Sequence, residues 1–317
     1  MPPIIGLTIP RHLKVSKKLF PMFRTSASSA AKDLSLSGSL LVILGGFHLL
    51  IWFTVGGEWE GPVSLRKPIL FGISTGLTLI SLGCLFDQLR PLKSDAWLMR
   101  ILSGALLIEV ALITIQQWRG QASHFNHSSS LNTTVEYAMT LFIVVAFVLI
   151  FQITVRAFCY LSTTAEYQLA LRAGLSFLVF SCLIGFLILW HGNNQIKIGQ
   201  NPSTFGKAGV TKFPHGISIH SLQFFPLLCW SFAKLGLTMN ERITSIRFLI
   251  TAMSGFLCFS GVQTLSGKDR FQMSPLSACL FAISVGCLIP VAWVVTRHLA
   301  ASVTEIFLDW REKITRH

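Results

Sequence analysis

The stretch WLMRILSGALLIEVALITIQQ, residues 97–117, is an apolar run with one carboxylate, Glu109, near its middle. A hydrocarbon core roughly 30 Å thick is crossed by a helix of about 20 apolar residues. A carboxylate inside such a span costs roughly 2.5–3.5 kcal/mol on insertion scales, so it normally faces a protein interior or a wet cavity. The stretch therefore predicts a transmembrane helix that presents Glu109 to a polar site.

Similar apolar runs recur along the whole chain, which is 52% hydrophobic and only 12% charged. A soluble chain carries about 25% charged residues. The runs predict eight transmembrane helices, at about 35–55, 68–87, 97–117, 135–157, 169–190, 216–235, 245–265 and 275–296. We therefore expect an all-α fold, a polytopic integral membrane bundle, because a β-barrel would show short segments of alternating hydrophobicity instead.

Lysine and arginine are distributed unequally between the two sets of connections. With the N-terminus in the cytoplasm, 18 of these residues lie on the inner side and 8 on the outer side. Positive charge accumulates on cytoplasmic loops, so we expect both termini to be cytoplasmic, in a bacterial inner membrane. Residues 1–34 would form a basic cytoplasmic tail, 35–297 the transmembrane domain and 298–317 a cytoplasmic C-terminal tail.

The net charge of +13 would also suit a nucleic-acid-binding protein. However, the basic residues lie between apolar runs and form no nucleic-acid motif. The lipid bilayer is therefore the expected partner, and nucleic acid is not. The seven cysteines lie mostly within apolar runs without a CxxC pair, a pattern typical of small core residues and not of a disulfide framework or zinc cluster.

Polar residues follow Glu109 where the predicted helix leaves the membrane. Gln116 lies about two helical turns further on and can share a stripe with Glu109. The loop RGQASHFNH follows, from Arg119 onward. Buried acids can relay protons, imidazole is the commonest metal ligand and guanidinium suits anions. We therefore assign candidate catalytic roles to Glu109 and His124, and substrate binding to Gln116, Arg119 and Asn126; the alternatives are a structural acid and an ordinary solvated loop.

Other histidines lie in or beside predicted helices. In LGGFH, His48 follows two glycines, which suits a flat haem with axial histidines or simply close helix packing. In HGISIHSLQ, His220 and Gln223 share a helical face, whereas His215 and His220 lack the i,i+4 spacing of a zinc pair. His48 and His220 are candidate cofactor ligands, and Gln223 is a candidate for substrate binding. A transition metal would be held by His124, His215 and His220; the alternative is structural hydrogen bonding.

Three motifs together carry a resemblance. They are RKP at 66–68, RGQASHFN at 119–126 and HSLQFFP at 220–226. In this combination the chain resembles a group of bacterial polytopic membrane proteins to which no reaction is assigned. The resemblance covers about residues 55–235. Besides the candidate residues already named, the shared motifs include Lys67, Pro68, Gly120, Ser123, Phe125 and Pro226.

Three functions suit a polar site of histidine, glutamate and arginine that opens on the outer face. The first is a redox protein or other metalloprotein that holds haem or a transition metal. The second is a small-solute or ion transporter with Glu109 as its coupling site. The third is a membrane-embedded hydrolase or transferase that acts on a lipid. These alternatives leave open whether the protein is an enzyme.

Overall fold

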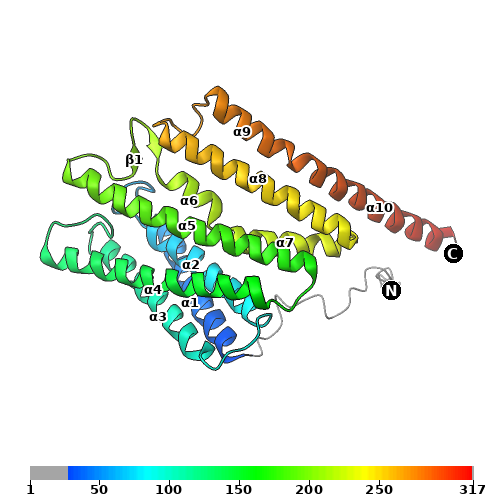
Figure 1. Ribbon diagram of the computed structural model, residues 1–317, viewed down its shortest axis with the longest axis horizontal. Coiled ribbons are helices and arrows are strands. Elements are labelled where there is room, and N and C mark those ends of the chain that lie inside the picture. The colour runs from blue at the N-terminus through cyan, green and yellow to red at the C-terminus, as the bar shows by residue number, and fades with distance from the viewer. Residues whose placement is uncertain (1–27, 316–317) are drawn as a thin grey trace.

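The computed structural model describes residues 28–315, which form a bundle of long helices with one short two-stranded hairpin (Figure 1). In chain order the elements are α1 (Ser29–Val55), α2 (Arg66–Phe86), α3 (Asp95–Trp118), α4 (Ser130–Tyr160), α5 (Ala165–Lys197), β1 (Thr204–Phe205), β2 (Gly209–Val210), α6 (Lys212–Ser218), α7 (Ser221–Lys234), α8 (Met239–Leu265), α9 (Pro275–Gly286) and α10 (Leu288–Thr315). Most of the predicted basic tail lies outside the described residues.

The prediction of an all-α, polytopic membrane fold is confirmed. Seven helical segments within the described residues are long and apolar enough to cross a membrane, and they correspond to seven of the predicted runs. The remaining run, predicted at 216–235, falls on two short helices, α6 and α7, which are separated at Ile219 and His220. These helices follow one another through the bundle in Figure 1, so together they make one interrupted crossing.

The connections between helices gather at the two ends of the bundle (Figure 1). The start of α1 and the end of α10 lie toward the same end, as expected for an even number of crossings. We name this the inner end. The opposite end, which carries the loop between α3 and α4 and the β1–β2 hairpin, is the outer end. That the inner end faces the cytoplasm stays a prediction.

Apolar side chains form two clusters, and α5 contributes to both. The first cluster contains residues from each of the helices α1 through α5, including Leu79, Leu102 and Leu175. The second joins α5 to α7, α8 and α10 and includes Phe225 and Ile246. The position of α5 between the two clusters agrees with its place in the middle of the bundle in Figure 1. Helix α5 therefore links the two halves of the fold.

Arginines at the inner end are paired with acids. Arg156 Nη1 donates to Asp95 Oδ1 at 2.6 Å, and Arg156 Nη2 donates to Asp95 Oδ2 at 3.1 Å. Arg242 Nη2 lies 2.9 Å from Oε1 of the buried Glu166. Such partly buried pairs, particularly the bidentate one, hold more firmly than exposed pairs. They join α3 to α4 and α5 to α8.

Helices α1 and α2 are in backbone contact through glycines. A Cβ atom added at Gly45 would lie 2.9 Å from the backbone N of Ile73 and 3.0 Å from the carbonyl of Ile69. A Cβ at Gly72 would lie 2.9 Å from Gly45 Cα. Small residues allow this approach, since between apolar helices in lipid van der Waals packing supplies much of the attraction. The packing role expected for the glycines of LGGFH is thus observed at Gly45, whereas Gly46 meets nothing within 4 Å.

Substituting these adjacent glycines tests the packing. Gly45→Ala should destabilise the protein by about 1–3 kcal/mol, because the added methyl group forces the backbones of α1 and α2 apart. Gly46→Ala, the matched control, should be neutral or stabilising by up to about 1 kcal/mol, since alanine is the better helix former. Thermal unfolding in detergent measures both effects. Equal melting temperatures for the two variants would contradict the close approach.

Candidate functional site

Four residues of α2 lie on one side of the helix. Lys67, Phe71, Ser74 and Thr78 recur at intervals of four, three and four residues, a spacing that places side chains one above another. At a rise of 1.5 Å per residue they extend about 16 Å from the outer end toward the middle of the bundle. We name these four residues the α2 stripe.

The outer half of the α2 stripe contacts the loop between α3 and α4. Lys67 Nζ donates to Ser123 Oγ at 3.3 Å and to the carbonyl of Pro62 at 2.8 Å. Ser123 Oγ lies 2.9 Å from His124 Nδ1. The Phe71 ring stacks on the same imidazole, with ring centroids 5.8 Å apart. The structure therefore brings the RKP and SHFN motifs together.

The inner half of the α2 stripe contacts the third motif, at the start of α7. Ser74 Oγ lies 3.4 Å from His220 Nε2. One helical turn deeper, Gln223 Nε2 donates to Thr78 Oγ1 at 3.2 Å. The shared helical face expected for His220 and Gln223 is thus the face that meets α2. All three motifs converge on one stripe.

The α6–α7 interruption leaves polar groups without partners. Among the described residues, the backbone N–H of His220 donates to no backbone carbonyl. The Ser221 hydroxyl is fully buried and also has no hydrogen-bond partner there. Helix α5 closes one side of this break, because a Cβ at Gly174 would lie 2.7 Å from Leu222 Cα. Non-helical backbone at membrane depth is tolerated where protein or a wet cavity surrounds it, and here α5 and the α2 stripe supply that protein.

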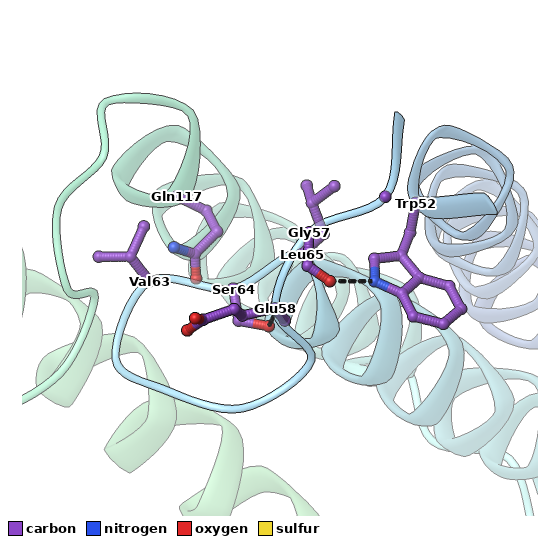
Figure 2. Close-up of a pocket in the computed structure, with 8 residues that line it drawn as sticks. Trp52, Gly57, Glu58, Val63, Ser64, Leu65 and Gln117 are labelled. Carbon is purple, nitrogen blue, oxygen red and sulfur yellow. Dashed lines mark hydrogen bonds between the residues drawn. The ribbon is translucent and has the colours of Figure 1, made fainter. Parts of the chain in front are cut away.

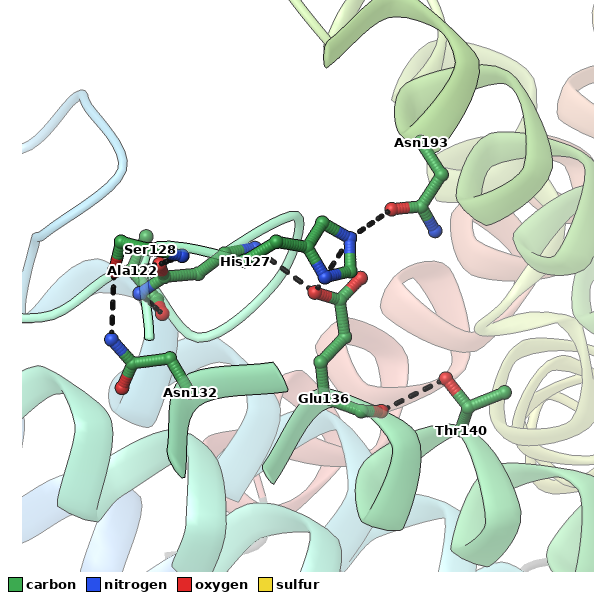
Figure 3. Close-up of polar contacts among 8 residues, drawn as sticks. Ala122, His127, Ser128, Asn132, Glu136, Thr140 and Asn193 are labelled. Carbon is green, nitrogen blue, oxygen red and sulfur yellow. Dashed lines mark hydrogen bonds and ion pairs between the residues drawn. The ribbon is translucent and has the colours of Figure 1, made fainter. Parts of the chain in front are cut away.

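A buried carboxylate holds the loop between α3 and α4 in place (Figure 3). Glu136, on α4, is 3% exposed, and its Oε2 accepts a hydrogen bond from the backbone N of Asn126 at 2.9 Å. His127 Nε2 lies 3.4 Å from the same oxygen and 3.1 Å from Asn193 Oδ1 on α5. Sequence reasoning missed Glu136. The sequence feature that could have indicated Glu136 is the position of this acid in the second turn of α4, one turn beyond Asn132.

Three residues predicted to bind substrate also order this loop. Gln116 Nε2 donates to Asn132 Oδ1 at 3.1 Å, and Arg119 Nη1 donates to Gln116 Oε1 at 2.5 Å. Asn126 donates through its side chain to the carbonyl of Ala122 at 2.9 Å. Gln116, Arg119 and Asn126 therefore have structural hydrogen bonds, and their contact with a substrate stays a prediction.

The loop also contains a strained residue. Phe125 has a φ of 59°, a value that bulky side chains rarely adopt and that costs about 1–3 kcal/mol. Its ring lies against Gly192 of α5, where a Cβ would approach to 2.5 Å from Phe125 Cζ. The adjacent amide of Asn126 is held by Glu136. Strain of this kind persists where surrounding contacts enforce it, and it is concentrated at functional sites.

His48 lies apart from the α2 stripe and bridges α1 to α3. Its Nδ1 donates to the carbonyl of Leu44 at 2.8 Å, and its Nε2 accepts from Trp118 Nε1 at 3.1 Å. Both ring nitrogens are thus occupied. Haem ligation by His48, expected from the sequence, would require breaking the bond to Trp118.

The predicted metal ligands do not form a cluster. Within residues 28–315, no group of three or more histidine, cysteine or acidic side chains could hold a metal ion. His215 Nδ1 donates to the carbonyl of Ser181 on α5 at 2.9 Å, whereas His124 and His220 lie against different levels of the α2 stripe. The structure thus brings His124 and His220 to one stripe without making them joint ligands.

The outer end of the α2 stripe is positively charged. Arg66 Nη1 lies 2.5 Å from Glu60 Oε1, whereas Lys67 and Lys212 form no ion pair with a carboxylate in the described part of the chain. We name Arg66, Lys67 and Lys212 the outer cation cluster. Burial, and then the positive charges of Lys67 and Lys212, lower the pKa of His124 to about 3. The site therefore combines a neutral imidazole with two ammonium groups that form no ion pair among the described residues, a donor set that suits an anion.

Glu109 is buried on α3 and takes part in none of the contacts described above. It is 5% exposed, and its Oε2 has no hydrogen-bond partner among the described residues. No hydrogen bond or ion pair joins it to the α2 stripe within that part of the chain. An unpaired carboxylate in such surroundings is costly. The structure thus agrees with the expectation that Glu109 is buried, and within the described residues no hydrogen bond or ion pair joins it to His124, the other candidate catalytic residue.

Comparison with models of protein families, with curated proteins and with solved structures finds no match for this chain. The fold and the geometry described above are therefore the basis for assigning a function.

The low pKa of His124 predicts a pH dependence of stability. In the unfolded chain a histidine is protonated near pH 6.5, whereas in the folded protein His124 is protonated only near pH 3. Between these values the unfolded state binds more protons, so stability should fall as the pH falls, by at most about 1.4 kcal/mol per pH unit. His124→Asn should flatten this slope between pH 6.5 and 5. Melting curves in detergent measure it, and an unchanged slope would contradict the assignment.

Proposed function

We propose that this chain is a transporter for a small anionic solute in the inner membrane of a bacterium, with the α2 stripe as part of the path. The observation that carries the proposal is the interruption between α6 and α7, which lies opposite the stripe and supplies His220 and Gln223 to it. Transporters often build their binding sites from discontinuous helices, whose free backbone groups and positive N-terminal ends face anionic groups of the substrate. The backbone N–H of His220, directly before α7, has no backbone acceptor among the described residues.

The charge of the outer end supports an anion. Lys67 and Lys212 lie close enough to His124 to lower its pKa, and neither has a carboxylate partner among the described residues. Cations without a carboxylate partner raise the local concentration of anions and speed their association. A ligand that binds at the outer cation cluster would next meet Ser74 and His220 along the α2 stripe. The arrangement thus supports an entrance and a deeper polar position on one face of one helix.

The alternative functions have weaker support. A metal ion at His124 would be repelled by Lys67 and Lys212, and no metal-binding cluster occurs within the described residues. A lipid hydrolase or transferase would need a general base whose pKa lies near the working pH. His124, with a pKa of about 3, is poorly suited to that role.

Replacing Lys67 tests the proposed entrance. Lys67→Gln should weaken the binding of a probe anion about tenfold or more, since hydrogen bonds to charged groups are worth roughly 1.5–3 kcal/mol. Inorganic phosphate, sulfate and acetate are the first probes, with binding measured by calorimetry in detergent. Uptake of the tightest-binding radiolabelled anion into proteoliposomes then tests transport.

Lys197→Gln is the matched control, because Lys197 is an exposed lysine at the outer end of α5 that lies outside the outer cation cluster. It should bind the probe as the wild type does. Equal losses of anion affinity in the two variants would show that the Lys67→Gln result reflects general surface charge and not a specific site. Binding without uptake in the wild type would contradict transport while leaving the anion site in place.

Glu109 is the proposed coupling site, because its carboxyl group is buried without a partner for Oε2 among the described residues. In Glu109→Gln, uptake should lose its dependence on an imposed proton gradient, whereas the melting temperature should not fall, since the neutral amide tolerates burial better than a carboxylate. Uptake into proteoliposomes with and without the gradient measures this. A variant that still responds to the gradient would exclude Glu109 from coupling.

A further inference from the structure

A second polar site lies at the outer end, beside the loop that precedes the α2 stripe. A pocket there lies among the end of α1, the loop that leads to α2, and the last turn of α3 (Figure 2). We name it the outer pocket; its lining includes Trp52, Glu58, Val63, Ser64, Leu65 and Gln117. Three glycines with positive φ, at 56, 57 and 61, allow the loop to turn around this space.

Gln117 is the unusual residue of the outer pocket. It is 7% exposed, yet neither its Oε1 nor its Nε2 has a hydrogen-bond partner among the described residues. The neighbouring amide, Gln116, has partners at both ends. Buried amides are normally paired, so an unpaired one indicates a bound group or water. Figure 2 shows the side chain of Gln117 reaching from α3 toward Ser64 and Glu58.

The other walls of the outer pocket determine the charge of a ligand. Glu58 supplies the only charged side chain in the lining, and it forms no ion pair within residues 28–315. The indole of Trp52 is held in place, because its Nε1 donates to the carbonyl of Gly57 at 3.2 Å. The Ser64 hydroxyl is already used, since it donates to the carbonyls of Glu58 and Trp59. The available groups are therefore a carboxylate, an aromatic ring and a free carboxamide.

These groups match an organic ammonium ion. A carboxylate pairs with an ammonium group, and an aromatic face attracts a cation. The carboxamide of Gln117 can pair with a neighbouring hydroxyl or ester oxygen of the same molecule. We propose that the outer pocket binds an ethanolamine-type group, a primary ammonium with an oxygen two carbons away. This inference is independent of anion transport along the α2 stripe.

Calorimetry on the full chain in detergent tests this site, with ethanolamine as the first probe and a short-chain phosphatidylethanolamine as the second. Saturable binding of ethanolamine itself would identify a small-molecule site. Binding of the lipid alone would identify a headgroup site, and both results support the proposal. Absence of saturable binding for both probes would overturn it.

Variants assign the contacts. Glu58→Gln and Gln117→Leu should each weaken binding about tenfold or more. Glu60→Gln is the matched control, since Glu60 pairs with Arg66 and does not line the outer pocket. Propylamine, which lacks the oxygen, should bind the wild type more weakly than ethanolamine does. The two amines should bind the Gln117→Leu variant with equal affinity.

Melting temperatures show whether each variant is folded. Gln117→Leu removes two unpaired polar atoms from a buried position, so it should melt no lower than the wild type. Undiminished binding of the stronger probe by this variant would overturn the role of Gln117 and with it the proposed ligand class.

Discussion

A backbone amide inside a membrane must find a partner within the protein or in enclosed water, and the α6–α7 interruption is where this constraint acts most strongly. The N–H of His220 there has no backbone acceptor among the described residues. The close approach of α5 at Gly174 encloses one side of the break. Ser74 and Thr78 of α2 meet the other side through His220 and Gln223. The position of the candidate site therefore follows from the need to surround this break with protein.

Basic side chains have different partners at the two ends of the bundle. At the inner end, Arg156 and Arg242 are matched by partly buried acids and act as ties between helices. At the outer end, Lys67 and Lys212 form no ion pair within the described residues, and burial together with their positive charge keeps His124 neutral. The positive charge of the outer end is thus available to a ligand, whereas the charge of the two inner arginines is already used by the fold.

Two adjacent amides illustrate how the same chemistry takes different roles. Gln116 and Gln117 are consecutive on α3, so they point about 100° apart around the helix. Gln116 meets Asn132 and Arg119 and orders the loop that carries His124. Gln117 lines the outer pocket with both polar atoms free of partners among the described residues. A polar residue near a membrane surface is therefore a stronger sign of a ligand when the fold leaves it unpaired.

The sequence by itself determined the class of fold and the place of nearly every crossing, because the length of an apolar run is a local property. It also indicated His124, His220 and Gln223 as residues of interest, since their motifs stand out from the apolar background. It did not reveal the break at 219–220, because an apolar run reads the same whether its helix is continuous or interrupted. It also missed Glu136, a carboxylate whose role depends on a loop folding back over it.

The tertiary structure decided which of these residues meet. Ser74 and His220 are 146 residues apart in the chain, and their contact depends on the order in which helices pack, which composition and spacing do not encode. The same packing joined His48 Nε2 to Trp118 of α3, and it left Gln117 without a partner among the described residues. Local hydrophobicity thus predicted the helices, and only the packing of one helix against another determined where a site could form.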